Sequence, residues 1–149
     1  MDSTNKTLVS SVEQDRISRH LLAWLNRFPG KPVQSVNYEF LRDGEPGLAL
    51  STIQAAYKIR NYILGGYQAQ YQFKLIYRVQ PETTNDARLK ADEVLNAYGD
   101  WATSEQVPEL GEGIRCLRIE ANTRSSLFAR YENGDEDHQI LMNMIYEVI

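Results

Sequence analysis

The stretch Tyr62–Gln80, YILGGYQAQYQFKLIYRVQ, decides the fold, because apolar and polar residues alternate along it after two glycines. One face carries Tyr67, Ala69, Tyr71, Phe73, Leu75, Tyr77 and Val79. The other face carries Gln68, Gln70, Gln72, Lys74, Arg78 and Gln80, with Ile76 as the exception. A period of two is typical of a strand with one buried face. The pattern therefore predicts a strand over 67–79, about 43 Å long at ~3.3 Å per residue.

This strand is more than twice the typical length of ~5 to 6 residues, and two interpretations explain it. It is either a central strand, bent by a bulge, that crosses the whole sheet, or a strand with one end that leaves the body. A projecting hairpin has to cover its edges against another copy or a partner. The uncharged glutamine row is easier to desolvate than a charged one. Gly65 and Gly66 fit a two-residue hairpin turn, whose positions need positive φ, or a bulge.

Two amphipathic helices flank the strand region. Over 10–30, apolar residues recur at spacings of three and four, Ser10 and Glu13 have capping-box spacing, and Pro29-Gly30 end the helix. The second helix is predicted over 83–104, capped by Thr83 or Asn85. The core is expected to pack Leu21, Trp24, Leu25, Val94, Leu95, Tyr98 and Trp101 against Phe73, Leu75 and Tyr77.

The remaining strands complete an α+β fold. They are predicted over 33–41, 48–54, 57–64, 114–122, 126–132 and 139–149. Hairpin-like turns between them, such as Asn133-Gly134, favour a mainly antiparallel sheet with both helices on one face. Residues 1–9 are expected to form a flexible tail and residues 10–149 a single domain.

Composition excludes several classes of function. The chain has 149 residues, a net charge of −4 and a single cysteine, Cys116. An acidic chain without a basic run does not match a nucleic-acid binder, and one cysteine allows neither an internal disulfide nor a Cys/His zinc site. No apolar run approaches the ~20 residues of a membrane span. The N-terminus lacks the apolar segment of a secretory signal, which favours a cytoplasmic protein.

No catalytic signature is found. The histidines are His20, in the first helix, and His138, beside an acidic turn. A Ser–His–Asp triad through His138 is formally possible, yet any chain rich in Ser and Asp offers such combinations.

The acidic and glycine-rich segments do not predict a metal site or a phosphate site. Residues 135–137 lack the calcium-loop pattern, so a solvated turn is the favoured interpretation. The glycines of LGGY and GEG lack phosphate-loop spacing. Cys116 is expected to be buried packing. The sequence therefore predicts no catalytic, cofactor-binding or metal-binding residue, and no enzyme.

A family resemblance extends over residues 10–149. It is carried by a first helix that ends in an aromatic residue and by the segments VNYEFLRDGEPGLALSTIQ (36–54), YKIRNYILGGYQAQYQFKLIYRV (57–79), WATSEQVPEL (101–110) and ILMNMIYEVI (140–149). In these features the chain resembles the minor capsid proteins of long-tailed bacteriophages and prophages of Gram-positive bacteria, a group similar to tail terminators.

The resemblance implies a structural role in a virion. Tail terminators are rings of about six copies that cap the head-proximal end of the tail tube and present a surface to the head–tail connector. It implies a sandwich-like α+β fold, no cofactor, no membrane and no specific nucleic-acid binding. Its partners would be copies of itself, the tail tube protein and the connector, with genomic DNA passing through the lumen. The chain would be assembled in the host cytoplasm and reside in the virion tail.

Two segments are candidates for the subunit or tail-tube interface. The hairpin candidates are Tyr62, Gly65, Gly66, Tyr67, Gln68, Gln70, Tyr71 and Gln72. The loop candidates are Arg42, Asp43 and Glu45. Two alternatives stay open: another neck or head-completion protein, and a small α+β ligand-binding or enzymatic domain. The second alternative needs an apolar cavity that holds a pair of residues with shifted pKa values.

Overall fold

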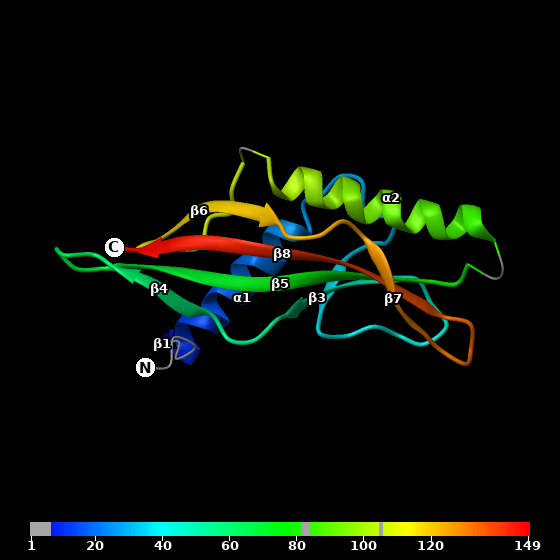
Figure 1. The fold of residues 1–149 in the computed structure, drawn as a ribbon, viewed down its shortest axis with the longest axis horizontal. Coiled ribbons are helices and arrows are strands. Elements are labelled where there is room, and N and C mark those ends of the chain that lie inside the picture. Colours follow the sequence, from blue (N-terminus) through cyan, green and yellow to red (C-terminus); the bar gives the residue numbers. More distant parts are fainter. Residues whose placement is uncertain (1–6, 82–83, 105) are drawn as a thin grey trace.

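The fold is built on one mainly antiparallel sheet, of which the computed structural model describes eight strands (Figure 1). The described residues are 7–81, 84–104 and 106–149. In chain order the elements are β1 (Thr7–Leu8), α1 (Ser11–Leu25), β2 (Val36–Tyr38), β3 (Gly47–Thr52), β4 (Tyr57–Asn61), β5 (Tyr67–Val79), α2 (Asn85–Ala102), β6 (Ile114–Ala121), β7 (Ser126–Arg130) and β8 (Glu136–Val148). The predicted α+β class is confirmed.

Two strands of equal length form the centre of the sheet. β5 and β8 are 13 residues each and pair antiparallel from Tyr67 opposite Val148 to Val79 opposite Glu136 without a register shift. On its other edge β5 pairs with β4 and then with β3, and β8 pairs with β6 and then with β7. The long strand is therefore central, as one interpretation predicts, but it has no bulge. The register shifts lie in β4, β6 and β7 instead.

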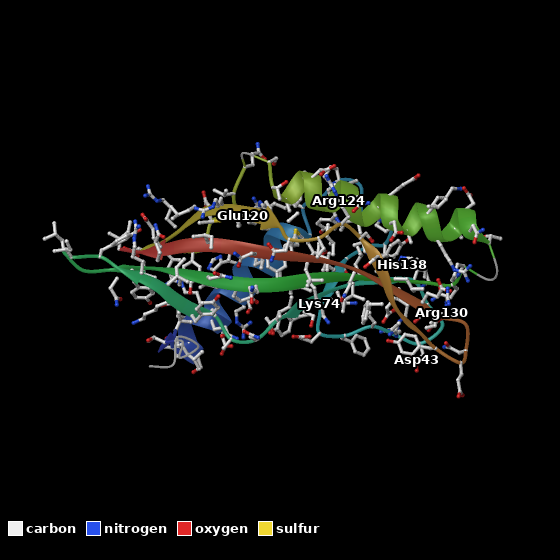
Figure 2. The ribbon with its side chains drawn as sticks, viewed as in Figure 1. Asp43, Lys74, Glu120, Arg124, Arg130 and His138 are labelled. Atoms are coloured by element: carbon white, nitrogen blue, oxygen red, sulfur yellow. The ribbon has the colours of Figure 1, made fainter. Side chains whose placement is uncertain are left out.

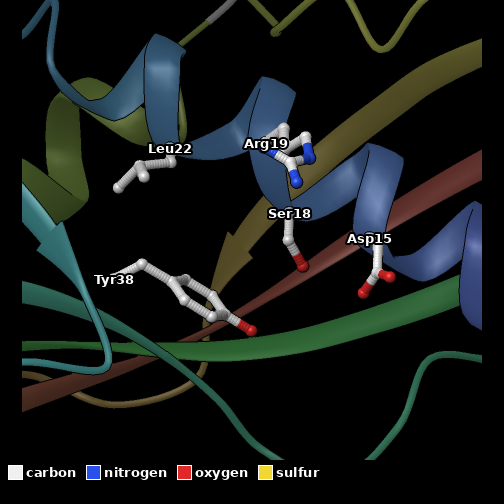
Figure 3. Close-up of a pocket in the computed structure, with 5 residues that line it drawn as sticks. All are labelled: Asp15, Ser18, Arg19, Leu22 and Tyr38. Atoms are coloured by element: carbon white, nitrogen blue, oxygen red, sulfur yellow. The ribbon is translucent and has the colours of Figure 1, made fainter.

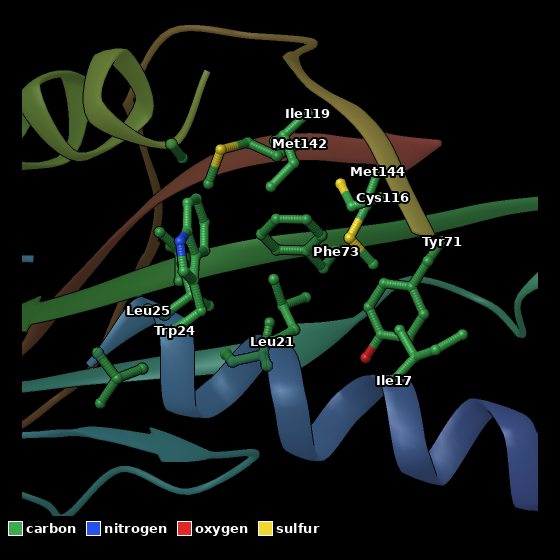
Figure 4. Close-up of a cluster of buried hydrophobic side chains, with 14 of the residues drawn as sticks. Ile17, Leu21, Trp24, Leu25, Tyr71, Phe73, Cys116, Ile119, Met142 and Met144 are labelled. Atoms are coloured by element: carbon green, nitrogen blue, oxygen red, sulfur yellow. The ribbon is translucent and has the colours of Figure 1, made fainter. Parts of the chain in front are cut away.

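Both helices lie on the same face of this sheet and share one hydrophobic core (Figures 1 and 4). Phe73 from β5 and Met142 from β8 point into this core with Leu21 of α1. The indole rings of Trp24 in α1 and Trp101 in α2 stack with centroids 4.4 Å apart. Since burial of a large aliphatic side chain contributes about 1.5–3 kcal/mol, this shared core fixes both helices against the central strands.

The helix caps confirm one half of the predicted capping box and correct the other. The Ser10 hydroxyl accepts a hydrogen bond from the Glu13 N–H at 3.1 Å. The Glu13 carboxylate makes no hydrogen bond with the Ser10 N–H. It accepts hydrogen bonds from the hydroxyls of Tyr67 and Tyr146 instead. Thr84 caps α2, which corrects the predicted cap Asn85: that residue is the first of the helix. The other predicted cap, Thr83, lies outside the described residues.

Several features of the strands differ from the sequence predictions. Thr7–Leu8 pairs with β4 and Val9 is buried, so the end of the expected tail packs against the folded body. β2 pairs with β3 in parallel, because the segment 39–46 carries the chain back before β3 begins. β8 begins at Glu136, three residues before the predicted start at 139, because its acidic residues are buried by ion pairs.

The face of the central strands away from the helices is called the open face. It carries the even-numbered residues of β5 and the odd-numbered residues of β8, which are Gln68, Gln70, Gln72, Lys74, Ile76, Arg78, Asp137, Gln139, Leu141, Asn143, Ile145 and Glu147. Neither helix of the described chain packs on it. The candidate site lies along this face.

Candidate functional site

The hairpin tip, residues 62–66, is the turn between β4 and β5 and projects at one end of the molecule (Figure 1). The Gly65 N–H donates to the Tyr62 carbonyl at 3.3 Å, and the Tyr62 N–H donates to the Gly66 carbonyl at 3.0 Å. Ile63 and Leu64 therefore occupy the centre of the turn. Of the two interpretations of Gly65 and Gly66, the two-residue turn is wrong and the bulge fits: the glycines follow Ile63 and Leu64 with φ of +100° and +81°, as in a three-residue loop closed by a glycine bulge.

The two apolar residues of the tip have no cover within the chain. Ile63 is 101% exposed and Leu64 is 100% exposed. Isolated exposed apolar residues are ordinary, but two adjacent ones at the end of a projecting turn form a knob. The sequence analysis assigned both residues to a strand and did not include them among the interface candidates.

The base of the tip is held against the end of β8. A Cβ atom on Gly66 would lie 2.3 Å from the Val148 carbonyl oxygen, so only glycine fits there. The Tyr62 hydroxyl donates to the Glu147 carboxylate at 2.9 Å, and Arg115 donates to the same carboxylate at 2.5 Å. These hydrogen bonds, that of Tyr62 first, lower the pKa of Glu147. The contacts of Tyr62 and Gly66 with the end of β8 therefore hold Ile63 and Leu64 in position.

The predicted interface residues of β5 divide between the two faces. Gln68, Gln70 and Gln72 lie half-buried on the open face. Tyr67 and Tyr71 point toward the helices, where the Tyr67 hydroxyl binds Glu13. Tyr71 is 1% exposed and its hydroxyl is 2.7 Å from Ser18 Oγ. Tyr71 therefore cannot contact a partner while the chain keeps this fold.

The predicted loop residues Arg42, Asp43 and Glu45 lie in the segment 39–46, which crosses the other end of the open face, and all three are exposed. The side chain of Asp43 is 94% exposed, and the Arg42 and Glu45 side chains form a 4.0 Å ion pair at the surface. The Gly44 N–H donates to Asp135 at 2.8 Å, and Arg78 donates to the Arg42 carbonyl at 3.5 Å. These contacts bring the 39–46 segment to the ends of β5 and β8.

The acidic cluster 135–137 is buried, which corrects the expectation of a solvated turn. Asp135 is 1% exposed, Glu136 3% and Asp137 2%. The Gly44 N–H is the main cause that lowers the pKa of Asp135. Glu136 accepts three hydrogen bonds from Arg88 of α2 and one from Arg130, and the Arg88 hydrogen bonds are the main cause of its lowered pKa. Arg88 binds Glu136 and Arg78 binds Asp137. Both arginines are distant in the sequence, so no local pattern predicts these ion pairs.

A hollow of about 330 Å³ opens on the open face beside the 39–46 segment. We call it the aromatic hollow; its lining includes Phe40, Leu41, Ile76, Phe128 and Tyr131. Phe40 is 54% exposed, Phe128 41% and Tyr131 43%. In Figure 2, Lys74 lies near the middle of the sheet and Asp43 near the end opposite the hairpin tip, and the hollow lies between these regions.

The aromatic walls of the hollow are held by charged groups. The Lys74 ammonium lies 5.1 Å from the centroid of the Phe128 ring, and the Arg78 guanidinium lies 4.8 Å from that of Tyr131. The Tyr131 hydroxyl donates to Asp137 at 2.8 Å. Cation–π contacts of this kind restrict the rings. The sequence did not predict this site, because its lining residues come from five separate segments.

His138 does not form a Ser–His–Asp arrangement with the neighbouring serine. His138 is 1% exposed beneath α2, and its Nδ1 lies 2.8 Å from Asp92, which also accepts the Ser125 hydroxyl at 2.7 Å. The serine therefore binds the carboxylate and not the imidazole, so the formally possible triad is absent from this cluster. His20 is half-buried on α1.

Other potential chemistry is equally limited. Cys116 is buried, and burial raises the pKa of its thiol to about 12, which disfavours a nucleophilic thiolate. Within the described ranges, no group of three or more His, Cys, Asp or Glu side chains is arranged to hold a metal ion. No helix in the described part of the chain is long and apolar enough to span a membrane.

A second hollow, of about 310 Å³, lies between α1 and β2 (Figure 3). Asp15, Ser18, Arg19, Leu22 and Tyr38 line it. Its buried hydroxyl, on Ser18, is already paired with Tyr71. Of the other lining residues, Asp15 and Arg19 are exposed charged side chains of α1, which by themselves do not define a ligand.

Comparison with known proteins relates this arrangement to a solved fold. No family model matches the sequence, and no curated protein matches it. A chain of a solved structure described as "Virion of native gene transfer agent (GTA) particle" superposes with a TM-score of 0.55 at 15% identity, covering 90% of this chain and 93% of that chain. This likeness shows a shared fold. A second solved structure, at TM-score 0.49 and 14% identity over 95% of this chain and 96% of that chain, is too distant to support a conclusion.

Proposed function

We propose that this chain is a structural protein of a phage or phage-like virion and acts as a tail terminator. In this role about six copies form a ring that caps the head-proximal end of the tail tube and offers a surface to the head–tail connector. The observation that carries the proposal is the fold shared, over 90% of this chain, with a chain of a gene transfer agent virion. The sequence resemblance to minor capsid proteins of Gram-positive phages supports the same role.

The open face supplies surfaces suited to assembly. A ring contact is heterologous, so each copy needs one surface that donates and another that accepts. The hairpin tip and the 39–46 segment lie at opposite ends of the open face. We assign subunit or tube contacts to Tyr62, Gly65, Gly66, Gln68, Gln70, Gln72, Arg42, Asp43 and Glu45.

The charge of the chain suits a channel for DNA. Each copy carries a net charge of −4. A ring with an acidic lumen repels the phosphate backbone, so that DNA slides through without binding. A ring structure with a basic lumen would contradict this part of the proposal.

The same geometry gives no support to the enzymatic alternative. That alternative needs an accessible cavity with a pair of residues whose pKa values are shifted. His138 is closed off beneath α2, and the aromatic hollow is lined by Asp137, whose carboxylate is already paired with Arg78. We therefore propose a protein without catalytic activity or cofactor.

The test is to locate the chain in particles. An antibody raised against the purified chain is applied to particles released by cells that encode it, and these are viewed by negative-stain microscopy. Label at the head-proximal end of the tail is expected. Label on the head side of the connector would favour the neck-protein alternative, and absence of the chain from purified particles would overturn the virion role.

A further inference from the structure

The hairpin tip and the aromatic hollow both expose large hydrophobic side chains. The tip presents Ile63 and Leu64 fully exposed on a turn held by Gly66 and Tyr62. The hollow presents partly exposed aromatic rings over a volume of about 330 Å³. Charged side chains, among them Lys74 and Arg78, also line the hollow, but packing the two aliphatic side chains of the tip against its exposed rings removes apolar surface of both from water, which is favourable.

The tip of a chain cannot reach the hollow of the same chain. The tip precedes Tyr67 at one end of β5, and Ile76 lines the hollow nine residues further along that strand. Because β5 is regular, this separation is about 30 Å at ~3.3 Å per residue. A tip that enters such a hollow therefore belongs to another copy.

The two chain segments that carry the tip and the rim of the hollow differ in charge. The segment Tyr57–Tyr67 carries Lys58 and Arg60 and no acidic residue. The segment 39–46, at the rim of the hollow, carries Glu39, Asp43 and Glu45 against a single cation, Arg42. Opposite charges at the rims steer two copies together and fix their orientation.

We propose that the hairpin tip of one copy inserts Ile63 and Leu64 into the aromatic hollow of the next copy. This deepens the proposed ring, on which it rests, by naming both halves of the subunit contact. The contact is heterologous, because the tip and the hollow lie at opposite ends of the open face. Repetition of such a contact continues from copy to copy until the ring closes.

The test uses two complementary variants of the full chain. The tip variant is Ile63→Asp with Leu64→Asp, and the hollow variant is Phe40→Asp with Phe128→Asp. All four residues are exposed, so each variant is expected to fold, which circular dichroism checks. A control variant carries Val12→Asp and Leu89→Asp, which are 77% and 61% exposed on the two helices, outside both surfaces.

Light scattering across a wide concentration range measures the assembly state. The wild type and the control are expected to form rings, and each interface variant alone is expected to remain at the 17.1 kDa of one copy. An equimolar mixture of the two variants keeps one intact tip and one intact hollow. The intact tip of the hollow variant can enter the intact hollow of the tip variant, so the mixture is expected to give a species of twice that mass. A symmetric tip-to-tip contact would not give it, because one of the two tips is mutated.

Three results would overturn the inference: rings from the tip variant, a mixture that remains monomeric, or a wild type that stays monomeric at every concentration. None of these removes the virion role, because the antibody experiment tests that role on particles. Conversely, rings that form as expected from a chain absent from particles would uphold the contact and reject the proposed function.

Discussion

Arg78 and Asp137 face each other across the two central strands and form a two-pronged ion pair. Arg78 Nε donates to Asp137 Oδ1 at 2.7 Å and Nη2 donates to Oδ2 at 2.8 Å. The pair is buried, with side-chain exposures of 10% and 3%. The hydrogen bonds to Asp137 raise the pKa of Arg78, which stays charged. Because Arg78 also binds the Arg42 carbonyl, the pair connects the sheet to the 39–46 segment.

Removal of one member of this pair is expected to be costly. Asp137→Ala leaves the Arg78 cation buried without its partner, which lowers the free energy of unfolding by about 3–5 kcal/mol. Urea denaturation measures the loss. Asp43→Asn is the matched control, since that carboxylate contacts the same guanidinium at 3.4 Å but is 94% exposed, and a change below about 1 kcal/mol is expected. Equal losses in both variants would contradict this assignment.

Gly66 and Gly65 are expected to differ in their tolerance of a side chain. Both have positive φ, which costs any other residue conformational energy. Only at Gly66 would a Cβ collide with backbone, the Val148 carbonyl oxygen, whereas nothing lies within 4 Å of a Cβ on Gly65. Gly66→Val should leave the fold intact, displace the hairpin and abolish assembly.

Hydrogen exchange of the Tyr62 amide measures the displacement, because that N–H is bonded to the Gly66 carbonyl. Exchange should be faster in Gly66→Val than in Gly65→Ala. If Gly66→Val assembles with unchanged yield, the hairpin has no part in the contact.

The acidic cluster makes stability depend on pH in the acid range. Asp135 and Glu136 have pKa values lowered from their usual 3.8 and 4.5. Since the folded state binds these protons more weakly, their stabilisation is complete above the unfolded values and is lost as pH falls through the folded ones. The free energy of unfolding should therefore decline below about pH 4.5.

Asp135→Asn tests the contribution of that residue. The variant should be less stable near neutral pH, and its stability should decline less steeply below pH 3.8 than that of the wild type. Denaturant titrations at a series of pH values measure both slopes. Parallel curves would mean that Asp135 does not contribute.

Glu13 is expected to contribute, after burial, to the raised pKa values of Tyr67 and Tyr146. Burial first, and then the hydrogen bond to Glu13, raise the pKa of Tyr67 to about 12. Glu13→Ala should lower this pKa only in part, because burial remains. It also leaves the buried Tyr146 hydroxyl without its acceptor, at a cost of about 1–3 kcal/mol. Alkaline ultraviolet titration measures the first effect and thermal unfolding the second.

Ser10→Ala is the control for Glu13, because it removes only the helix cap. It should cost about 1 kcal/mol and leave the tyrosine titration unchanged. If the pKa of Tyr67 is the same in Glu13→Ala and the wild type, the hydrogen bond does not contribute.

The sequence predicts those features that depend on periodicity. β5 is found over 67–79 as predicted, because a strand with one buried face must alternate. Likewise, Ile140, Met142, Met144 and Tyr146 share the buried face of β8. The helices follow from apolar stripes and caps, and their common face follows from the one-sidedness of those stripes.

Features that depend on contacts between distant segments could not be predicted. The acidic run 135–137 has the composition of a solvated turn, and its burial depends largely on Arg78, Arg88 and Gly44, which are far away in the sequence. The aromatic hollow is assembled in the same way from separate loops and strands. The turn at Ile63-Leu64 was misplaced by two residues, because local hydrophobicity favours a strand where the hydrogen bonds form a turn.

The unbroken pairing of β5 with β8 has a mechanical consequence. Hydrogen bonds between antiparallel strands run perpendicular to the strand axes. A pull applied at the hairpin tip and resisted at the far end of the sheet acts along those axes, so the whole ladder carries the load in shear at once. Under this load the hydrogen bonds cannot break one pair at a time from an end of the ladder. The sheet can therefore transmit tension along its full length with little extension.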